Sequence, residues 1–121
     1  MDYRVIAIKD NSGVAVGIEG LNGNAVIFIG SYYLPNGNKP LSLTDGYRFA
    51  VNKLHNLAPQ GKPLVIGVPV KVKLKRSAKM LASKMYGRQV TFVSIEPAER
   101  SGEQDLAKDA LKRKTNVEEV L

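Results

Sequence analysis

The sequence predicts an α/β fold with a mixed sheet of five strands flanked by helices. Two observations carry this prediction. Three strand-like runs joined by short turns occupy the first third of the chain, which indicates an antiparallel meander. Strand-like and helix-like segments then alternate, which indicates parallel strands joined by right-handed crossovers. The expected order along the chain is therefore β-β-β-α-β-α-β-α.

The strands of the meander are rich in β-branched and apolar residues, which favour extended backbone. Two turns separate them, Asp10–Gly13 and Gly20–Asn24. Asp and Asn side chains bond to nearby backbone groups and Gly tolerates positive φ, so both segments have the composition of tight turns. The strands are expected at Tyr3–Lys9, Val14–Glu19 and Ala25–Tyr33.

The first helix is expected after a loop rich in Pro, Gly and Asn, Leu34–Leu43. Thr44 is the expected N-cap, and Asp45 lies in the first turn, where an acidic side chain complements the helix dipole. Apolar residues then recur at helical spacing, which indicates one buried face. They are Tyr47, Val51, Leu54 and Leu57.

The second half of the chain begins with an uncharged apolar run, Pro63–Val70, which predicts a strand covered on both faces. A helix is expected at about Lys75–Tyr86 and a fifth strand at Gln89–Ile95. Ser101, followed three residues later by Gln104, predicts a capping box at the start of the last helix. The apolar stripe of that helix comprises Leu106, Ala107, Ala110 and Leu111.

The length of 121 residues predicts one domain, 1–121, in which residues 115–121 are expected to fray. The chain has no Cys, which excludes a disulfide framework, a Cys-based zinc site and a Cys nucleophile. Its one His, His55, excludes a His cluster. No secretory signal and no apolar run long enough to span a bilayer is evident, so an intracellular, cytoplasmic location is expected.

A formal net charge of +7 favours an acidic partner such as nucleic acid, although a generally basic surface is the alternative. The charge is densest directly after the apolar run Pro63–Val70. Ligands of open α/β sheets bind beyond the carboxyl ends of the strands, so this cluster is expected to contact phosphates, unless it is only a solvated face. Its members are Lys71, Lys73, Lys75, Arg76 and Lys79.

Four stretches of this sequence resemble one family. The strand order and the acidic residue after the first strand resemble the ribonuclease H-like fold. Within that fold, the chain resembles the RuvC/YqgF group of Holliday-junction resolvases. The stretches are VIAIKDNSGVAVGI (Val5–Ile18), LVIGVPVKVKLKRSAKMLASKM (Leu64–Met85), VTFVSIEPAERS (Val90–Ser101) and DLAKDAL (Asp105–Leu111).

The resemblance implies a metal-dependent endonuclease that cleaves structured DNA, with carboxylates that hold Mg²⁺ or Mn²⁺ as the active site. Asp10 matches the Asp of the first strand, and Glu96 matches the acidic residue after the fifth strand. Asp109 or Asp105 matches the Asp of the last helix, and Asp109 is the better expected ligand because it borders the apolar stripe. The implied catalytic set is thus Asp10, Glu96, Asp109 and Asp105, with metal held by Asp10, Glu96 and Asp109.

Each of these acidic residues also has a non-catalytic interpretation. Asp10 has the position of an Asx-turn residue. Glu96 lies in an expected loop, where a solvated acid is common. Asp105 lies near the start of a helix, where the dipole favours a negative charge.

Two departures from the resolvase pattern keep a second hypothesis open. Lys9 directly follows the apolar part of the first strand, so Asp10 comes one position late. Lysines also follow the fourth strand, where RuvC-type enzymes carry a Glu. The alternative to a nuclease is therefore a catalytically inactive ribonuclease H-fold module that binds DNA or RNA. For either hypothesis, DNA is the expected partner rather than RNA. A self-assembling structural protein, or a homodimer, is a third possibility.

Overall fold

The computed structural model describes residues 2–58, 61–69, 88–95 and 101–121, and these form one mixed sheet with a helix on each face. In that part of the chain, no helix is long and apolar enough to cross a bilayer. The helices are α1 (Leu43–Leu57) and α3 (Ser101–Arg113). The strands are β1 (Tyr3–Lys9), β2 (Gly13–Asn22), β3 (Ala25–Pro35), β4 (Leu64–Pro69), β5 (Val90–Ile95) and β6 (Val117–Val120).

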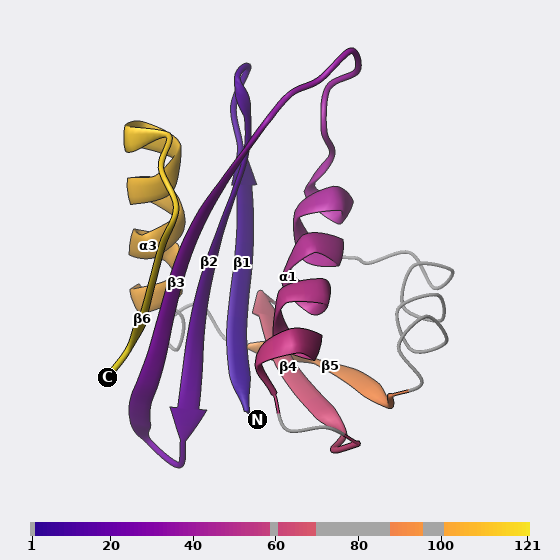
Figure 1. Cartoon of the computed structure of the whole chain (residues 1–121), viewed down its shortest axis with the longest axis vertical. Coiled ribbons are helices and arrows are strands. Elements are labelled where there is room, and N and C mark those ends of the chain that lie inside the picture. Colours follow the sequence, from indigo (N-terminus) through magenta and orange to yellow (C-terminus); the bar gives the residue numbers. More distant parts are fainter. Residues whose placement is uncertain (1, 59–60, 70–87, 96–100) are drawn as a thin grey trace.

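The strand order across the sheet is β5-β4-β1-β2-β3-β6 (Figure 1). The predicted meander is confirmed, since β2 pairs antiparallel with both β1 and β3. The predicted parallel half is also confirmed, since β4 pairs parallel with β1 and with β5. The expected helix at 75–86 lies outside the described residues.

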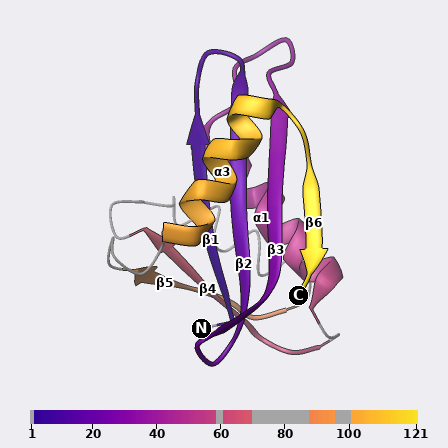
Figure 2. The same cartoon turned by 90° about the vertical axis from the view of Figure 1, so that its left-hand side faces the viewer.

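The main core lies between the sheet and α1, and α3 covers the opposite face (Figures 1 and 2). Because side chains alternate along a strand, one set from β1 and β2 faces α1 and the other faces α3. The helix contributes Tyr47, Ala50, Val51 and Leu54 to this core, where they meet Val5, Ala7, Val14, Val16 and Ile18.

Helix α1 is capped by Ser42 rather than by the predicted Thr44. The Ser42 hydroxyl accepts a hydrogen bond from the Asp45 backbone N–H at 3.2 Å, and the Asp45 carboxylate accepts one from the Ser42 backbone N–H at 2.8 Å. Asp45 thus takes the third helical position, where Glu or Gln usually completes this reciprocal pair. Thr44 lies inside the first turn.

The C-terminal residues, expected to fray, instead form the sixth strand, β6, antiparallel to β3. Lys114 has φ 56° and reverses the chain after α3. Glu118 then bonds to two groups on the α1 side of the sheet, the Lys53 ammonium at 2.8 Å and the Tyr32 hydroxyl at 2.9 Å. Contacts with residues far away in sequence therefore hold a strand whose own residues are exposed.

The backbone of helix α3 packs directly against β2, because β2 has a glycine, Gly17, at the point of contact. A Cβ added at Gly17 would overlap the Glu103 carbonyl oxygen, which no packing tolerates. Nearby, the Ser31 hydroxyl donates a hydrogen bond to the Leu106 carbonyl at 2.7 Å. Small side chains on the sheet thus allow the backbone of the helix to touch it.

This close contact encloses two carboxyl groups, one from each layer. Glu103 of α3 is completely buried and Glu19 of β2 is 7% exposed. The Arg4 guanidinium lies 3.6 Å from the Glu19 carboxylate. Burial, and then the neighbouring Glu19 carboxyl, raises the pKa of Glu103 to about 8. The protonated form of the Glu103 carboxyl is therefore favoured at neutral pH.

We predict that Gly17→Ala lowers the free energy of unfolding by about 1–3 kcal/mol, because α3 must move away from the sheet. Gly37→Ala is the matched control, since no atom lies within 4 Å of a Cβ added there. Urea unfolding followed by circular dichroism measures both. Equal stability of the two variants would contradict the contact between α3 and β2.

Because the pKa of Glu103 is raised, we predict that the free energy of unfolding depends on pH. Its ordinary pKa is 4.5 and its folded-state pKa is about 8, so the folded chain binds one more proton than the unfolded chain between these values. The free energy of unfolding should then fall as pH rises through this window, by at most about 1.4 kcal/mol per pH unit. Urea unfolding at pH 5 to 9 measures it.

The replacement Glu103→Gln should remove most of this slope, because the amide has no proton to lose. Glu119→Gln is the control, since Glu119 is exposed on β6. A slope that persists in Glu103→Gln would assign the pH dependence to another group.

Candidate functional site

Asp10, the predicted acid of the first strand, lies at the tip of the β1–β2 hairpin. Its Oδ1 atom accepts hydrogen bonds from the Ser12 hydroxyl at 2.6 Å, the Ser12 backbone N–H at 2.7 Å and the Gly13 backbone N–H at 3.3 Å. These bonds, the Ser12 hydroxyl first, hold the pKa of Asp10 below its ordinary range. The hydrogen bonds of Asp10 are those of an Asx-turn residue.

The register of the sheet relates Asp10 to β4. Tyr3 pairs with Ile66 and Arg4 with Gly67, so the same register, continued, sets Pro69 opposite Ile6. Asp10 is four residues farther along, about 13 Å at the rise of a strand. It therefore lies beyond Pro69, the last residue of β4 in the described part of the chain.

The predicted acids of the last helix, Asp105 and Asp109, lie on α3. Asp109 is half-exposed, and its Oδ1 accepts a hydrogen bond from Arg113 Nε at 2.9 Å, one helical turn away. Asp105 is exposed. The positive charge of Lys114 contributes to the lowered pKa of Asp10, which places the end of α3 near the hairpin tip.

The described acids do not form a metal centre. Across residues 2–58, 61–69, 88–95 and 101–121, no three His, Asp or Glu side chains lie where they could hold one ion. The predicted ligand Glu96 lies outside these residues. A magnesium or manganese site needs several converging oxygen ligands. The described carboxylates alone therefore do not fit the metal that the resemblance implies.

The predicted phosphate-binding cluster lies outside the described residues. Its members are Lys71, Lys73, Lys75, Arg76 and Lys79. The described strand that precedes it in the sequence is β4, which lies in the interior of the sheet, between β1 and β5.

Hydrogen bonds connect the tip of the β1–β2 hairpin to the end of β3 and, through β3, to the turn between α3 and β6. The Tyr33 hydroxyl donates to the Ser12 hydroxyl at 2.9 Å, and Asn36 Nδ2 donates to the Asn11 carbonyl at 3.1 Å. The Tyr33 backbone N–H donates to Asn116 Oδ1 at 2.7 Å, which brings in the turn between α3 and β6. Tyr33 is therefore a structural residue at this end of the sheet.

The buried pair of Glu19 and Glu103 did not appear among the expected site residues. Glu103 lies in the first turn of α3, where an acidic residue is usual for electrostatic reasons. Its burial depends on Gly17 and Glu19, which come from a strand distant in sequence. One feature of the sequence could have indicated that Glu103 is buried. Glu103 lies four residues before Ala107 and seven before Ala110, which places it on the same buried face of the helix, one turn earlier.

Comparisons with known proteins show what the fold resembles. Neither the models of known protein families nor the curated protein sequences give a match. Among solved structures, RNase H1 from the halophilic archaeon Halobacterium salinarum superposes with a TM-score of 0.66 at 11% identity, over 92% of this chain and 96% of that one.

Two further solved structures agree. LC11-RNase H1, in complex with an RNA/DNA hybrid, gives a TM-score of 0.65 at 12% identity over 93% of this chain and 96% of that one. The N-terminal RNase H domain of rv2228c from Mycobacterium tuberculosis gives 0.58 at 12% identity, over 92% and 94%. The chain therefore has the ribonuclease H fold, as its sequence predicted, and at this identity the likeness concerns the fold.

Proposed function

We propose that this chain is a nucleic-acid-binding protein that uses the ribonuclease H fold to contact phosphates, and that its binding does not require metal. The observation that carries the proposal is the state of the described acids. Asp10 is engaged by three hydrogen bonds of its own turn and Asp109 by Arg113. Each acid is thus engaged by partners of its own segment, which favours binding without metal over cleavage that depends on metal.

The charge of the chain supports the same proposal. A formal net charge of +7 favours nucleic acid as the partner, and lysines neutralise phosphates without reading base sequence. The cluster from Lys71 to Lys79 follows β4 directly in the sequence. Binding is then expected to be strongly dependent on salt and only weakly dependent on sequence.

A metal-dependent nuclease is the second candidate, and the likeness to RNase H1 structures favours it. In that case Glu96, with Asp10 and Asp109 or Asp105, would supply carboxylates. The resolvase-like motifs favour structured DNA as the substrate. One structural neighbour was solved with an RNA/DNA hybrid, which makes a hybrid the competing substrate.

The test compares a labelled four-way DNA junction, a DNA duplex and an RNA/DNA hybrid, each in EDTA and in Mg²⁺ or Mn²⁺. We expect binding in EDTA, an affinity that falls linearly on a plot of log K against log salt, and no cleavage products. The pair Lys73→Ala and Arg76→Ala should reduce that slope by about 2, because each phosphate that a cation neutralises adds about 0.9 to it.

Controls separate the two candidates. Asp10→Asn and Glu96→Gln should not weaken binding, because they remove no cation, and Lys62→Ala should leave the salt slope unchanged. Cleavage products in Mg²⁺ that disappear in Asp10→Asn or Glu96→Gln would establish the nuclease instead. Failure of all three nucleic acids to bind in a salt-dependent manner would overturn both candidates.

A further inference from the structure

Five exposed cations surround the end of the sheet at which β1 and α3 both end. They come from three separate segments, the end of β1, the loop between β3 and α1, and the end of α3. Figures 1 and 2 show these segments together at the upper end of the molecule. We call this set the basic rim: Lys9, Lys39, Lys112, Arg113 and Lys114.

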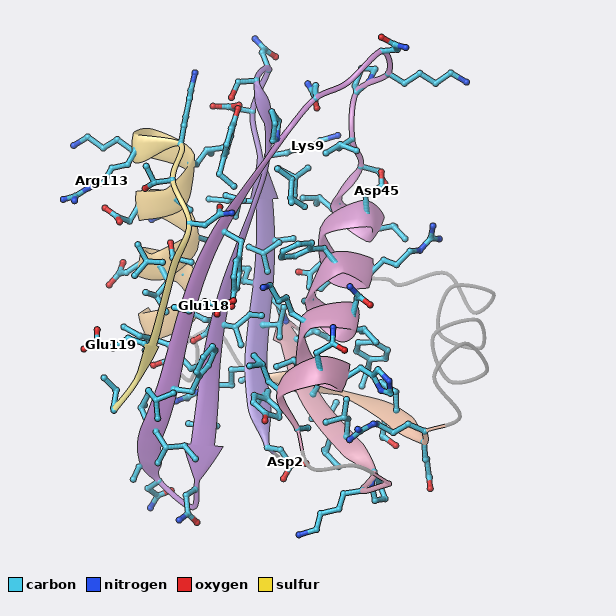
Figure 3. The ribbon with its side chains drawn as sticks, in the orientation of Figure 1. Asp2, Lys9, Asp45, Arg113, Glu118 and Glu119 are labelled. Atoms are coloured by element: carbon cyan, nitrogen blue, oxygen red, sulfur yellow. The ribbon has the colours of Figure 1, made fainter. Side chains whose placement is uncertain are left out.

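The acids at this end offset part of the positive charge of the rim. Arg113 pairs with Asp109, and within the described part of the chain this is the one ion pair that a rim residue makes. Asp10 lies near Lys114, and Asp45 lies in the first turn of α1. These three acids balance three of the five cations, so the rim keeps a net positive charge. Figure 3 shows Lys9 and Arg113 toward this end with Asp45 near them, and Asp2 at the other end.

Hydrogen bonds join the segments that carry or adjoin the rim residues. Hydrogen bonds join the hairpin tip to Tyr33 and Asn36 and join Tyr33 to Asn116. The Lys114 backbone N–H also donates to the Ala110 carbonyl at 2.7 Å. Cations on positioned segments lose less conformational freedom when they bind an anion.

A purely structural explanation covers only part of the rim. Basic residues at the end of a helix complement its dipole, and this accounts for Lys112, Arg113 and Lys114. It does not account for Lys9, which ends a strand, or for Lys39, which lies in a loop next to the start of α1, where the dipole favours negative charge.

We propose that the basic rim is a second phosphate-binding surface for nucleic acid, formed by residues other than those of the Lys71–Lys79 cluster. The inference rests on the proposed nucleic-acid binding and extends it. A phosphate backbone that crosses this end of the sheet contacts lysines from both helix-covered faces. The contacts are to phosphates, so the rim adds affinity and salt dependence without sequence preference.

The test uses a fluorescent DNA duplex and two double variants of the whole chain that remove the same amount of charge. Lys39→Gln with Lys112→Gln removes two rim cations. Lys62→Gln with Lys108→Gln removes two exposed cations outside the rim. We expect the rim pair to reduce the slope of log K against log salt by about 2, at about 0.9 per neutralised phosphate, and the control pair to leave it unchanged.

The outcomes separate this inference from the proposed function. Equal slopes in both double variants, or an unchanged slope in the rim pair, would contradict the phosphate-binding role of the rim. The proposed nucleic-acid binding would still hold if the wild-type chain binds the duplex. A wild-type chain that does not bind the duplex would overturn both proposals. Circular dichroism confirms that each variant is folded.

Discussion

The contact between the backbone of α3 and β2 at Gly17 is the constraint on which the rest of that face depends. It brings the helix near enough for Ser31 to bond to it and for Glu103 to be enclosed against Glu19. On the opposite face Gly46 of α1 plays a similar part, since a Cβ there would lie 2.8 Å from Val14 and 2.9 Å from Ala7. Close contact on both sides sets how near each helix lies to the sheet.

Local patterns in the sequence predicted much of this arrangement. The Asp-Asn-Ser-Gly turn marks the first hairpin, and the uncharged run at Pro63–Val70 marks a strand with neighbours on both edges. What could not be predicted depends on distant contacts. The strand β6 is only four residues long, and all four are exposed. Lys53 and Tyr32, which are distant in sequence, bind its Glu118 side chain. The formation of this strand therefore depends on tertiary contacts.

The candidate site was predictable only in part for the same reason. The Asp-Asn-Ser-Gly sequence already favoured a turn role for Asp10 over a catalytic one, and three hydrogen bonds to its oxygen agree with the turn. The basic rim is divided among segments up to about a hundred positions apart, so no single window of sequence reveals it. Glu103 looked like an ordinary helix-start acid, and its burial depends on the absence of a side chain at Gly17. Whether Glu96 and the Lys71–Lys79 cluster act as expected stays a prediction.

The central claim is that this ribonuclease H fold binds phosphates through its cations and not through a metal held by its described acids. The most direct measurement is amide NMR of the labelled chain, titrated separately with a DNA duplex and with Mn²⁺. We predict that DNA shifts the amide signals around Lys9, Lys39 and Lys112, and that Mn²⁺ causes no localised broadening at Asp10 or Asp109. Broadening by Mn²⁺ confined to those acids, without shifts at the rim on addition of DNA, would contradict the claim.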